Sequence, residues 1–538
     1  MRGANPHCRK ESHLIYEIRT YQIAPGSLAE VEKRFGDAYQ YRKKYSELTA
    51  FLHTEVGPLN EIVHIWGYKD LADRARVRGE ASKEANWPPK IQEFIRAMRS
   101  EIITPFGFIP EPHPGKLGPV YELRYYTIKP GTIADLAKGW ESKIAERGKL
   151  SPIVFAGPVE FGRANGYPIG DRTTYSQVRF LVGSLSHLDE IFEGRLIHRA
   201  GVPSRLVRAA AEPEVRYDYR GESLGLDQYL ARNPTTGLLI ARDDTILVER
   251  YQYARNDRHR FTSFSMAKTV TSMLIGIAIA EGRIRSVDDP AAAYVPGLAG
   301  TEYGRTSLRH LLQMSSGVRF LEEYSGRDDI TRLASDTFWL RGPGGVAAVT
   351  QFNERTAPGG TRFSYASVET QVLGLVLTHA LGRPVSAYLQ EKIWQPIGAE
   401  ADATWLVDRA GQESTFCCLN AVLRDYARLG LLLAHDGNWR GRQIIPAAWI
   451  REATTVRPEQ PYLAPRTATR FFGYGYQTWI FPDEPGMFAF LGIRGQTIYV
   501  DPSRRLVMVH TAVRKLPVDP ANAETIALWR GVVRDLGR

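Results

Sequence analysis

An internal repeat is the feature that most constrains how this chain folds. Residues 15–31 read IYEIRTYQIAPGSLAEV and residues 120–136 read VYELRYYTIKPGTIADL, so eight of seventeen positions are identical at an offset of 105 residues. In each copy a β-type run predicts a strand and Pro-Gly predicts a turn. Ser27 or Thr132 then begins a helical pattern as its N-cap, because a hydroxyl accepts an unpaired backbone N–H. The repeat therefore predicts two units of similar fold.

A second strand and a second helix follow in each copy. EIVHIWGYKD at 61–70 and YSQVRFLVGS at 175–184 predict the strands, and the segments after them predict helices. Each copy thus predicts a β-α-β-β-α-type unit of about 100 residues. The stretch EPHPGKLGP at 111–119 predicts the linker between the two copies.

The YEIRTY and YELRYY strands, the Pro-Gly pairs, and HIWGY with its basic helix and Trp87 resemble the NIPSNAP family. The resemblance implies ferredoxin-like α+β units of the dimeric-barrel type over 14–110 and 119–212. Two copies in one chain imply an internal pseudo-dimer or a homo-oligomer. His53 and His64 are isolated, and no catalytic motif stands out, so small-molecule binding and assembly both stay open for this half.

The C-terminal half predicts an antiparallel sheet with a helical middle. GLLIARDDTILVERY at 237–251 predicts a hairpin that turns at Asp243-Asp244. TIYVDPSRRLVMVHTAV at 497–513 predicts a second hairpin around Asp501-Pro502. Mostly helical segments lie between them, which favours an α/β arrangement with helices packed on the sheet.

The segment SFSMAKTVTSMLIGIAIAEG at 263–282 contains the only Ser-x-x-Lys of the chain, from Ser265 to Lys268. Apolar residues follow at helical spacing, and Gly282 predicts the end of the helix. Side chains three residues apart share one face of a helix. The helix dipole and a desolvated amine both favour loss of the serine proton. Spacing alone leaves two interpretations open: a nucleophile with its base, or an N-cap serine with a surface lysine.

Three further stretches follow in order: TSLRHLLQMSSGV at 306–318, PGGTRFSYASV at 358–368 and FLGIRGQTIYVDP at 490–502. With SMAKTVTS they resemble the superfamily of class C β-lactamases and penicillin-binding proteins, and most of all the 6-aminohexanoate-dimer hydrolases and related esterases. The resemblance covers 222–538 and implies a β-lactamase-like α/β domain with an antiparallel sheet and a helical subdomain. The predicted fold class of the whole chain is therefore multidomain α+β.

The same resemblance implies the roles of individual residues. Ser265 becomes the nucleophile of an acyl-enzyme and Lys268 its base. Tyr365 becomes the phenol that shuttles protons to the leaving group, with its pKa lowered by the nearby Lys268 ammonium. The backbone N–H groups of Ser265 and Gln496 become the oxyanion hole. This predicts a serine hydrolase.

Two positions depart from the β-lactamase motifs. Ser367 stands where the Tyr-x-Asn motif has asparagine. The Lys-Thr-Gly motif maps onto Ile493-Arg494-Gly495, so isoleucine replaces its lysine, and Arg494 is a candidate for the missing cation. Because the missing groups position a β-lactam, the sequence favours an ester or a small linear amide as substrate. Two alternatives stay open. One is a catalytically silent β-lactamase-like fold that acts in binding or assembly through the NIPSNAP-like repeats, and the other is a β-lactamase or penicillin-binding enzyme.

A second serine motif competes with Ser265. Gly221 to Gly225 fits Gly-x-Ser-x-Gly, the nucleophile elbow of α/β-hydrolases. The polar residues DYR precede it where an apolar strand is needed, and His310 and His510 are isolated. We therefore do not expect Ser223 to be the nucleophile.

Charge and cysteine content limit compartment and partners. The net charge is +10, but basic residues are scattered among acids, so no nucleic acid is expected. There is no apolar leader and no long apolar run, which predicts a cytoplasmic protein without a membrane partner. Cys8 lies apart, and the neighbours Cys417 and Cys418 are not expected to bridge, which favours a reduced compartment. The expected partner is a small-molecule ester or amide, with no cofactor and no metal.

Overall fold

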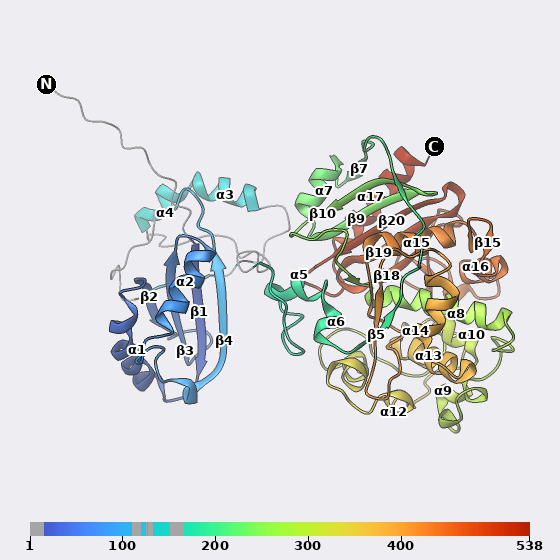
Figure 1. The fold of residues 1–538 in the computed structure, drawn as a ribbon, viewed down its shortest axis with the longest axis horizontal. Helices are drawn as coiled ribbons and strands as arrows, with labels where there is room; N and C mark the ends of the chain where they lie inside the picture. Colours follow the sequence, from blue (N-terminus) through green and yellow to red (C-terminus); the bar gives the residue numbers. More distant parts are fainter. Residues whose placement is uncertain (1–14, 110–119, 125, 127–132, 151–165, 538) are drawn as a thin grey trace. The chain divides into compact units, whose positions relative to one another are not determined.

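The computed structural model (Figure 1) describes residues 15–109, 120–124, 126, 133–150 and 166–537. The chain divides into two compact units. The described residues up to 168, together with 178–180, belong to the first unit, and 169–177 and the chain from 181 onward belong to the second.

The first unit is a four-stranded antiparallel sheet with two helices on one face (Figure 1). Its β-α-β-β-α-β order confirms the first predicted repeat and adds a fourth strand, Ile95–Ile103, that the sequence did not predict. The strand order is β2-β3-β1-β4. The first repeat contributes the elements β1 (Ile15–Ile23), α1 (Leu28–Arg42), β2 (Leu48–His53), β3 (Glu61–Tyr68), α2 (Leu71–Ala81), η1 (Gln92–Phe94) and β4 (Ile95–Ile103).

The two faces of this sheet bury different sets of residues, because successive side chains of a strand point to opposite sides. Helices α1 and α2 pack on the face that carries Ile62 and Trp66, which forms the larger core. The opposite face carries a smaller cluster of Ile18, Val63 and Ile103.

The start of α1 differs from the prediction in one detail. Gly26 turns the chain with φ 80°, as Pro-Gly predicted. Ser27 has helical φ and ψ, however, and its hydroxyl donates to the carbonyl of Ala24 at 2.6 Å instead of capping the helix. Side-chain capping needs an extended backbone at the N-cap, which Ser27 lacks. The N-cap predicted at Thr132 lies outside the described residues.

The second copy of the repeat folds differently from the first in the part that the structure describes. Its predicted first helix is present as α3 (Ile133–Glu141) and α4 (Ile144–Leu150), but 120–124 form no strand. The strand predicted over 175–184 is wrong, since this segment forms the turn η3 (Val178–Phe180) and helix α5 (Leu181–Ser184). All four residues of α5 are buried, and a short apolar run that is buried on every side does not distinguish strand from helix.

The segment after α5 joins the second unit. Helix α6 (Leu188–Ile191) is followed by β5 (Gly194–Ile197), which pairs with β12 (Ala403–Leu406). That small sheet has the order β11-β13-β12-β5, with β11 (Phe261–Thr262) and β13 (Leu419–Ala421).

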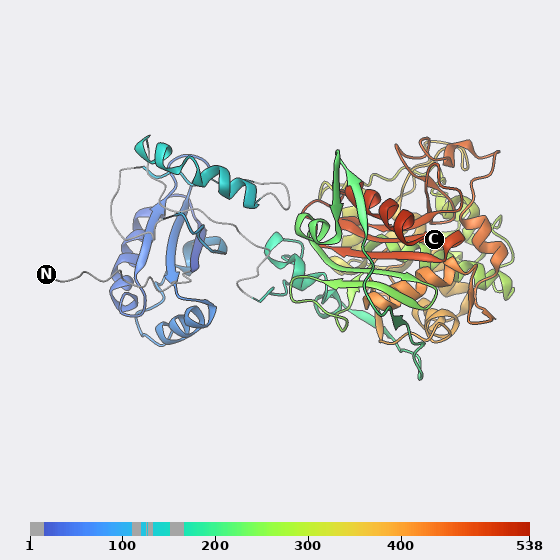
Figure 2. The same cartoon turned by 90° about the horizontal axis from the view of Figure 1, so that it is seen from above.

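The second unit is built on an eight-stranded sheet of order β16-β17-β18-β19-β20-β9-β10-β6, with helices on both faces (Figure 2). Both predicted hairpins are confirmed, as β9 (Thr235–Arg242) with β10 (Thr245–Tyr251) and β19 (Gln496–Asp501) with β20 (Leu506–Ala512). The remaining strands are β6 (Val207–Arg208), β7 (Arg216–Tyr219), β8 (Glu222–Gly225), β14 (Asn438–Trp439), β15 (Arg442–Gln443), β16 (Gly473–Tyr474), β17 (Trp479–Ile480) and β18 (Phe488–Gly492).

Helices cover the sheet and fill the segment between β11 and β16. Helices α7 and α17 share one core with the sheet, and α15 packs on β9, β19 and β20. The helices are α7 (Leu226–Arg232), α8 (Ala267–Ala280), α9 (Glu302–Arg305), α10 (Leu308–Leu312), α11 (Asp329–Ala334), α12 (Gly345–Thr350), α13 (Ser367–Leu381), α14 (Val385–Leu389), α15 (Leu423–Ala434), α16 (Ala447–Ala453) and α17 (Asn522–Leu536). Short helical turns are η4 (Phe264–Met266), η5 (Ala291–Ala293), η6 (Pro296–Leu298), η7 (Ser335–Trp339), η8 (Gln390–Trp394), η9 (Pro461–Leu463), η10 (Ile493–Gly495) and η11 (Pro502–Arg504).

No single helix in the described ranges has both the length and the apolar composition needed to cross a membrane. One bent pair, Ser367–Leu381 with Val385–Trp394, reaches those two criteria when its members are taken together.

Candidate active site

Ser265 and Lys268 lie where η4 runs into α8, and η4 packs against β18 and β19 of the large sheet. Helix α8 is buried along nearly its whole length, as its apolar run predicted, and Gly282 ends it with φ 69°. The Lys268 Nζ lies 2.8 Å from the Ser265 Oγ. Lys268 is only 2% exposed, whereas Ser265 is half-buried. The surface-lysine interpretation left open by the spacing is therefore wrong.

The environment of Lys268 favours its neutral amine. Burial lowers the pKa of Lys268 to about 8, and the charge of Glu322 opposes that shift. The second hydrogen bond of Nζ goes to the carbonyl of Phe416 at 2.8 Å, so that a neutral acceptor holds the amine in place. An amine with a pKa near 8 is present in both protonation states at neutral pH, which is what proton transfer requires.

Tyr365 is brought to the same place by the loop that precedes α13. The Lys268 Nζ lies 5.1 Å from the centroid of its ring, and the Ser265 side chain is close enough to act on the pKa of its phenol. The ring stacks on Trp479 at 5.3 Å between centroids. The lowered pKa expected for this phenol is wrong: burial and the charge of Glu322 raise it, and the contact with Ser265 offsets only part of the rise. Tyr365 is therefore a neutral phenol that can donate a proton.

Glu322 is a member of this group that the sequence analysis did not identify. It lies in the loop between α10 and α11 and accepts hydrogen bonds from the backbone N–H and the hydroxyl of Ser367, at 2.7 and 2.8 Å. The phenol of Tyr324 donates to it at 2.7 Å. No motif or periodicity marks this loop, so its position depends on the folded chain alone. Ser367, the residue in place of the motif asparagine, thus holds a carboxylate near the site.

The segment that replaces Lys-Thr-Gly lies against the serine turn. Both β18 and β19 pack on η4. A Cβ on Gly492 would lie 2.4 Å from the carbonyl oxygen of Ser263, so only glycine permits this approach. Gln496 begins β19 and its side chain donates to the carbonyl of Ala512 at 2.7 Å. Gly495 has φ 92° and its added Cβ would crowd Ala512, which also calls for glycine.

Arg494 is not brought to the serine. Its backbone is left-handed, with φ 61°, and its Nη1 donates to the carbonyls of Arg514 and Lys515, both at 2.8 Å. This geometry therefore does not support the prediction that Arg494 supplies the missing cation. Ile493, beside it, contributes its carbonyl as a weak acceptor for the Gln496 amide at 3.4 Å.

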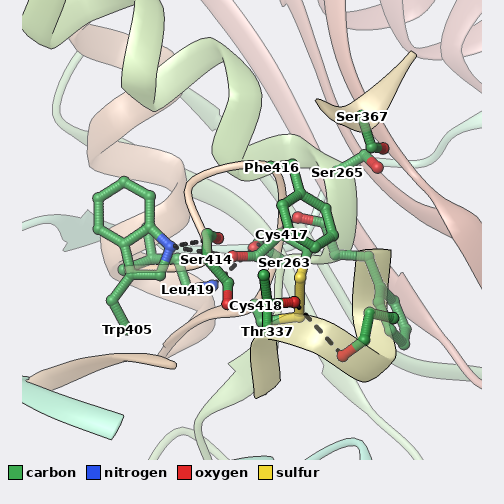
Figure 3. Close-up of a disulfide and its surroundings, with 12 residues drawn as sticks. Ser263, Ser265, Thr337, Ser367, Trp405, Ser414, Phe416, Cys417, Cys418 and Leu419 are labelled. Carbon is green, nitrogen blue, oxygen red and sulfur yellow. Dashed lines mark hydrogen bonds between the residues drawn. A yellow bond between two sulfur atoms is a disulfide. The ribbon is translucent and has the colours of Figure 1, made fainter. Parts of the chain in front are cut away.

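The loop that supplies the Phe416 carbonyl contains a disulfide between the neighbours Cys417 and Cys418 (Figure 3). The expectation that these two cysteines stay unpaired is wrong, because the chain turns at Cys418, which has φ 67°. The loop is tied to the start of η4, since the Leu419 N–H donates to the Ser263 hydroxyl at 3.0 Å. These contacts fix the acceptor of Lys268.

The competing serine motif has a different surrounding. Ser223 is exposed on β8, in a two-stranded sheet with β7, and its hydroxyl accepts from Arg216 at 3.4 Å. His510 is buried and bonded to Thr235 at 2.9 Å and to the carbonyl of Gly495 at 2.7 Å. Among the described residues, the hydroxyl of Ser223 therefore has no hydrogen bond to a general base.

Comparison with known proteins agrees with this fold. Residues 226–530, more than half of the chain, match the Beta-lactamase family model, and 16–110 with 121–167 match the NIPSNAP model. The chain therefore belongs to the Beta-lactamase family of serine hydrolases and carries an N-terminal NIPSNAP domain.

Individual relatives refine this placement. The 6-aminohexanoate-dimer hydrolase of Paenarthrobacter ureafaciens is 29% identical over 355 residues, which cover 64% of this chain and 89% of that protein. A solved structure from Bacillus anthracis that carries the name of the same hydrolase superposes with a TM-score of 0.62 at 24% identity, over 68% of this chain and 97% of that one. It supports the fold. A NipSnap homologue of Dictyostelium discoideum is 36% identical over 100 residues, 18% of this chain and 45% of that protein. The chain thus spans less than half of this NipSnap relative.

Proposed function

We propose that this protein hydrolyses an ester or a small linear amide through an acyl-enzyme on Ser265. The observation that carries the proposal is the 2.8 Å contact between a half-buried serine hydroxyl and a buried amine whose pKa is lowered to about 8. A hydroxyl paired with an amine that is partly neutral at pH 7 is an activated nucleophile.

The proposed reaction begins with attack of the Ser265 Oγ on the substrate carbonyl carbon while the Lys268 amine takes the serine proton. The backbone N–H groups of Ser265 and Gln496 stabilise the oxyanion. The neutral Tyr365 phenol gives its proton to the leaving alcohol or amine and regains one from the Lys268 ammonium. Water then attacks the acyl-enzyme, its proton returns to Ser265, and a carboxylic acid leaves.

Linear substrates fit this site better than β-lactams. A β-lactam carries a carboxylate that family members bind through the lysine of Lys-Thr-Gly, and here Ile493 stands in that place while Arg494 is engaged with backbone carbonyls. The carboxylate of Glu322 next to Ser367 disfavours a second anion there. The relative from Paenarthrobacter is named for a linear amide, the 6-aminohexanoate dimer.

A panel of p-nitrophenyl esters, linear amide oligomers and nitrocefin tests the proposal. We expect turnover of at least one ester or amide, loss of about 10³-fold or more in Ser265→Ala, and no nitrocefin turnover. Ser223→Ala is the matched control and should retain full activity. Absence of turnover in wild type would favour instead a catalytically silent fold that acts in binding, and equal turnover by wild type and Ser265→Ala would exclude Ser265 as the nucleophile.

A further inference from the structure

The NIPSNAP domain contains a concentrated group of arginines around one buried glutamate. Glu17 of β1 is 0% exposed. It accepts from Arg74 of α2 at 2.6 Å, from Arg78 of the same helix at 3.2 Å, and from its strand neighbour Arg19 at 3.1 Å. Burial raises the pKa of Glu17, but the hydrogen bond from Arg74 and the charges of Arg78 and Arg19 outweigh it and hold the pKa at about 2. Glu17 is therefore a carboxylate at all physiological pH values.

A fourth arginine joins this group through a tyrosine. Arg42 of α1 is 2% exposed, and its Nη2 donates to the Tyr68 phenol at 3.3 Å, while that phenol lies 3.5 Å from Glu17. The Arg42 guanidinium lies 4.6 Å from the ring centroid of Trp66, which pairs with Glu17 across the strands. The charges of Arg42, Glu17 and Arg78 act on one another. The four guanidinium groups thus surround one point of the sheet.

The charges of this group do not balance. Arginine does not lose its proton in proteins, so four positive charges face one negative charge. Among the described residues, Glu17 is the one carboxylate that Arg19, Arg74 and Arg78 contact, and Arg42 reaches it only through the Tyr68 phenol. A buried surplus of like charge is costly unless a further anion pairs with it.

Buried hydrogen-bond donors without acceptors lie in the same place. Nη1 of Arg42 and Nε of Arg74 have no partner. His64 is 3% exposed, and its Nδ1 accepts from the Trp66 indole at 2.6 Å, so its Nε2 carries the hydrogen, and that atom has no partner either. Buried donors are almost always satisfied in folded proteins, and a ligand is one explanation for several orphans together.

We propose that this arginine group binds the oxyanion of a small molecule, a carboxylate or a phosphate. Arg74 and Arg78 provide the approach from solvent, because their side chains are 20% and 40% exposed, whereas Arg42 and His64 lie behind them. Guanidinium groups suit this role because their paired N–H donors match the oxygen pairs of carboxylate and phosphate. The site lies wholly within the NIPSNAP domain and is independent of Ser265.

Calorimetric titration of the full-length chain with hexanoate, with inorganic phosphate and with the neutral hexanamide tests this site. We expect saturable 1:1 binding of hexanoate, phosphate or both, weakened by salt, and none of hexanamide. Saturation by hexanoate only would assign an organic carboxylate, and saturation by phosphate only would assign a phosphate. Arg74→Gln should weaken the binding at least tenfold. Arg76→Gln is the matched control, because Arg76 lies on the same helix but pairs with Asp73 and Glu80, and it should bind as wild type.

A second pair of variants guards against misfolding. Arg78→Gln removes a more exposed member of the group, and Glu17→Gln removes the internal carboxylate that competes for the arginines, so anion binding should weaken in the first and tighten in the second. Circular dichroism establishes that each variant is folded. The proposal is overturned if folded wild type shows no saturable binding of either anion, if hexanamide binds equally well, or if Arg76→Gln weakens binding as much as Arg74→Gln.

Discussion

Lys268 shows how burial and one neighbouring carboxylate set the chemistry of a single side chain. Its side chain is almost completely buried, which lowers the pKa of its amine to about 8, and the charge of Glu322 opposes this shift. The same carboxylate raises the pKa of Tyr365. One glutamate therefore acts on both the proposed base and the proposed proton donor.

The pH dependence of the reaction follows from the pKa of Lys268. The amine must be neutral to accept the serine proton, so kcat/KM for an ester should rise with pH and level off above about pH 8. Lys268→Met should lower kcat/KM by about 10²–10⁴-fold. A pH–rate profile from pH 6 to 10 measures the first effect, and a profile that is flat or falls through pH 8 would contradict it.

Replacing Glu322 tests its electrostatic effect on Lys268. Because the glutamate charge raises the pKa of Lys268, Glu322→Gln should move the rise of the pH–rate profile to lower pH. Glu323→Gln is the control, since Glu323 is exposed and its charge is no cause of the Lys268 shift. An unchanged profile in Glu322→Gln, or the same displacement in both variants, would count against the account.

Motifs identified some of these residues and could not identify others. Ser265 and Lys268 follow from one helical spacing, and Tyr365 follows from its family motif. Glu322 and Phe416 are placed by loops without periodicity, so no sequence pattern points to them. The direction of Arg494 depends on a left-handed backbone at that residue, with φ 61°, which the sequence did not reveal.

At the scale of elements, close approach of β18 to η4 positions the serine turn. The missing side chain of Gly492 permits this approach, because an added Cβ would lie 2.4 Å from the Ser263 carbonyl oxygen. Strand β18 therefore helps to position the backbone N–H of Gln496, the proposed oxyanion donor, because Gly492 pairs with Gln496 across the hairpin.

Gly492→Ala should separate β18 from the serine turn. Overpacking of this kind costs about 1–3 kcal/mol, so we expect a lower midpoint of thermal unfolding together with a large loss of ester turnover. Gly201→Ala is the control, because an added Cβ there meets nothing within 4 Å. If Gly492→Ala keeps wild-type stability and turnover, the proposed role of this approach is wrong.

Sequence patterns predicted the hairpins of the second unit correctly and the strand over 175–184 wrongly. Both hairpins of the large sheet have turn residues at their tips and were predicted correctly. The strand predicted over 175–184 is a helical turn and a short helix, because the residues of α5 are buried on all sides and carry no period. Turn residues thus located the hairpins although β9, β19 and β20 are buried along nearly their whole length, whereas tertiary packing decides a buried run that has no such signal.

At the scale of the whole molecule, the chain joins a serine hydrolase of the Beta-lactamase family to a NIPSNAP domain. Each has its own core and its own group of buried charges: Lys268 with Glu322 in one, and the arginines around Glu17 in the other. We propose bond cleavage by the first and anion binding by the second, with the hydroxyl of Ser265 forming the covalent intermediate.

Covalent trapping of the full-length protein with a fluorophosphonate tests this claim most directly. Intact-mass and peptide mass spectrometry should find one adduct per chain, on the peptide that contains Ser265, with loss of ester turnover in proportion to labelling. Ser265→Ala should take up no label, whereas Ser223→Ala should label as wild type does. Absence of an adduct, or an adduct on any other residue with Ser265 unmodified, would contradict the account.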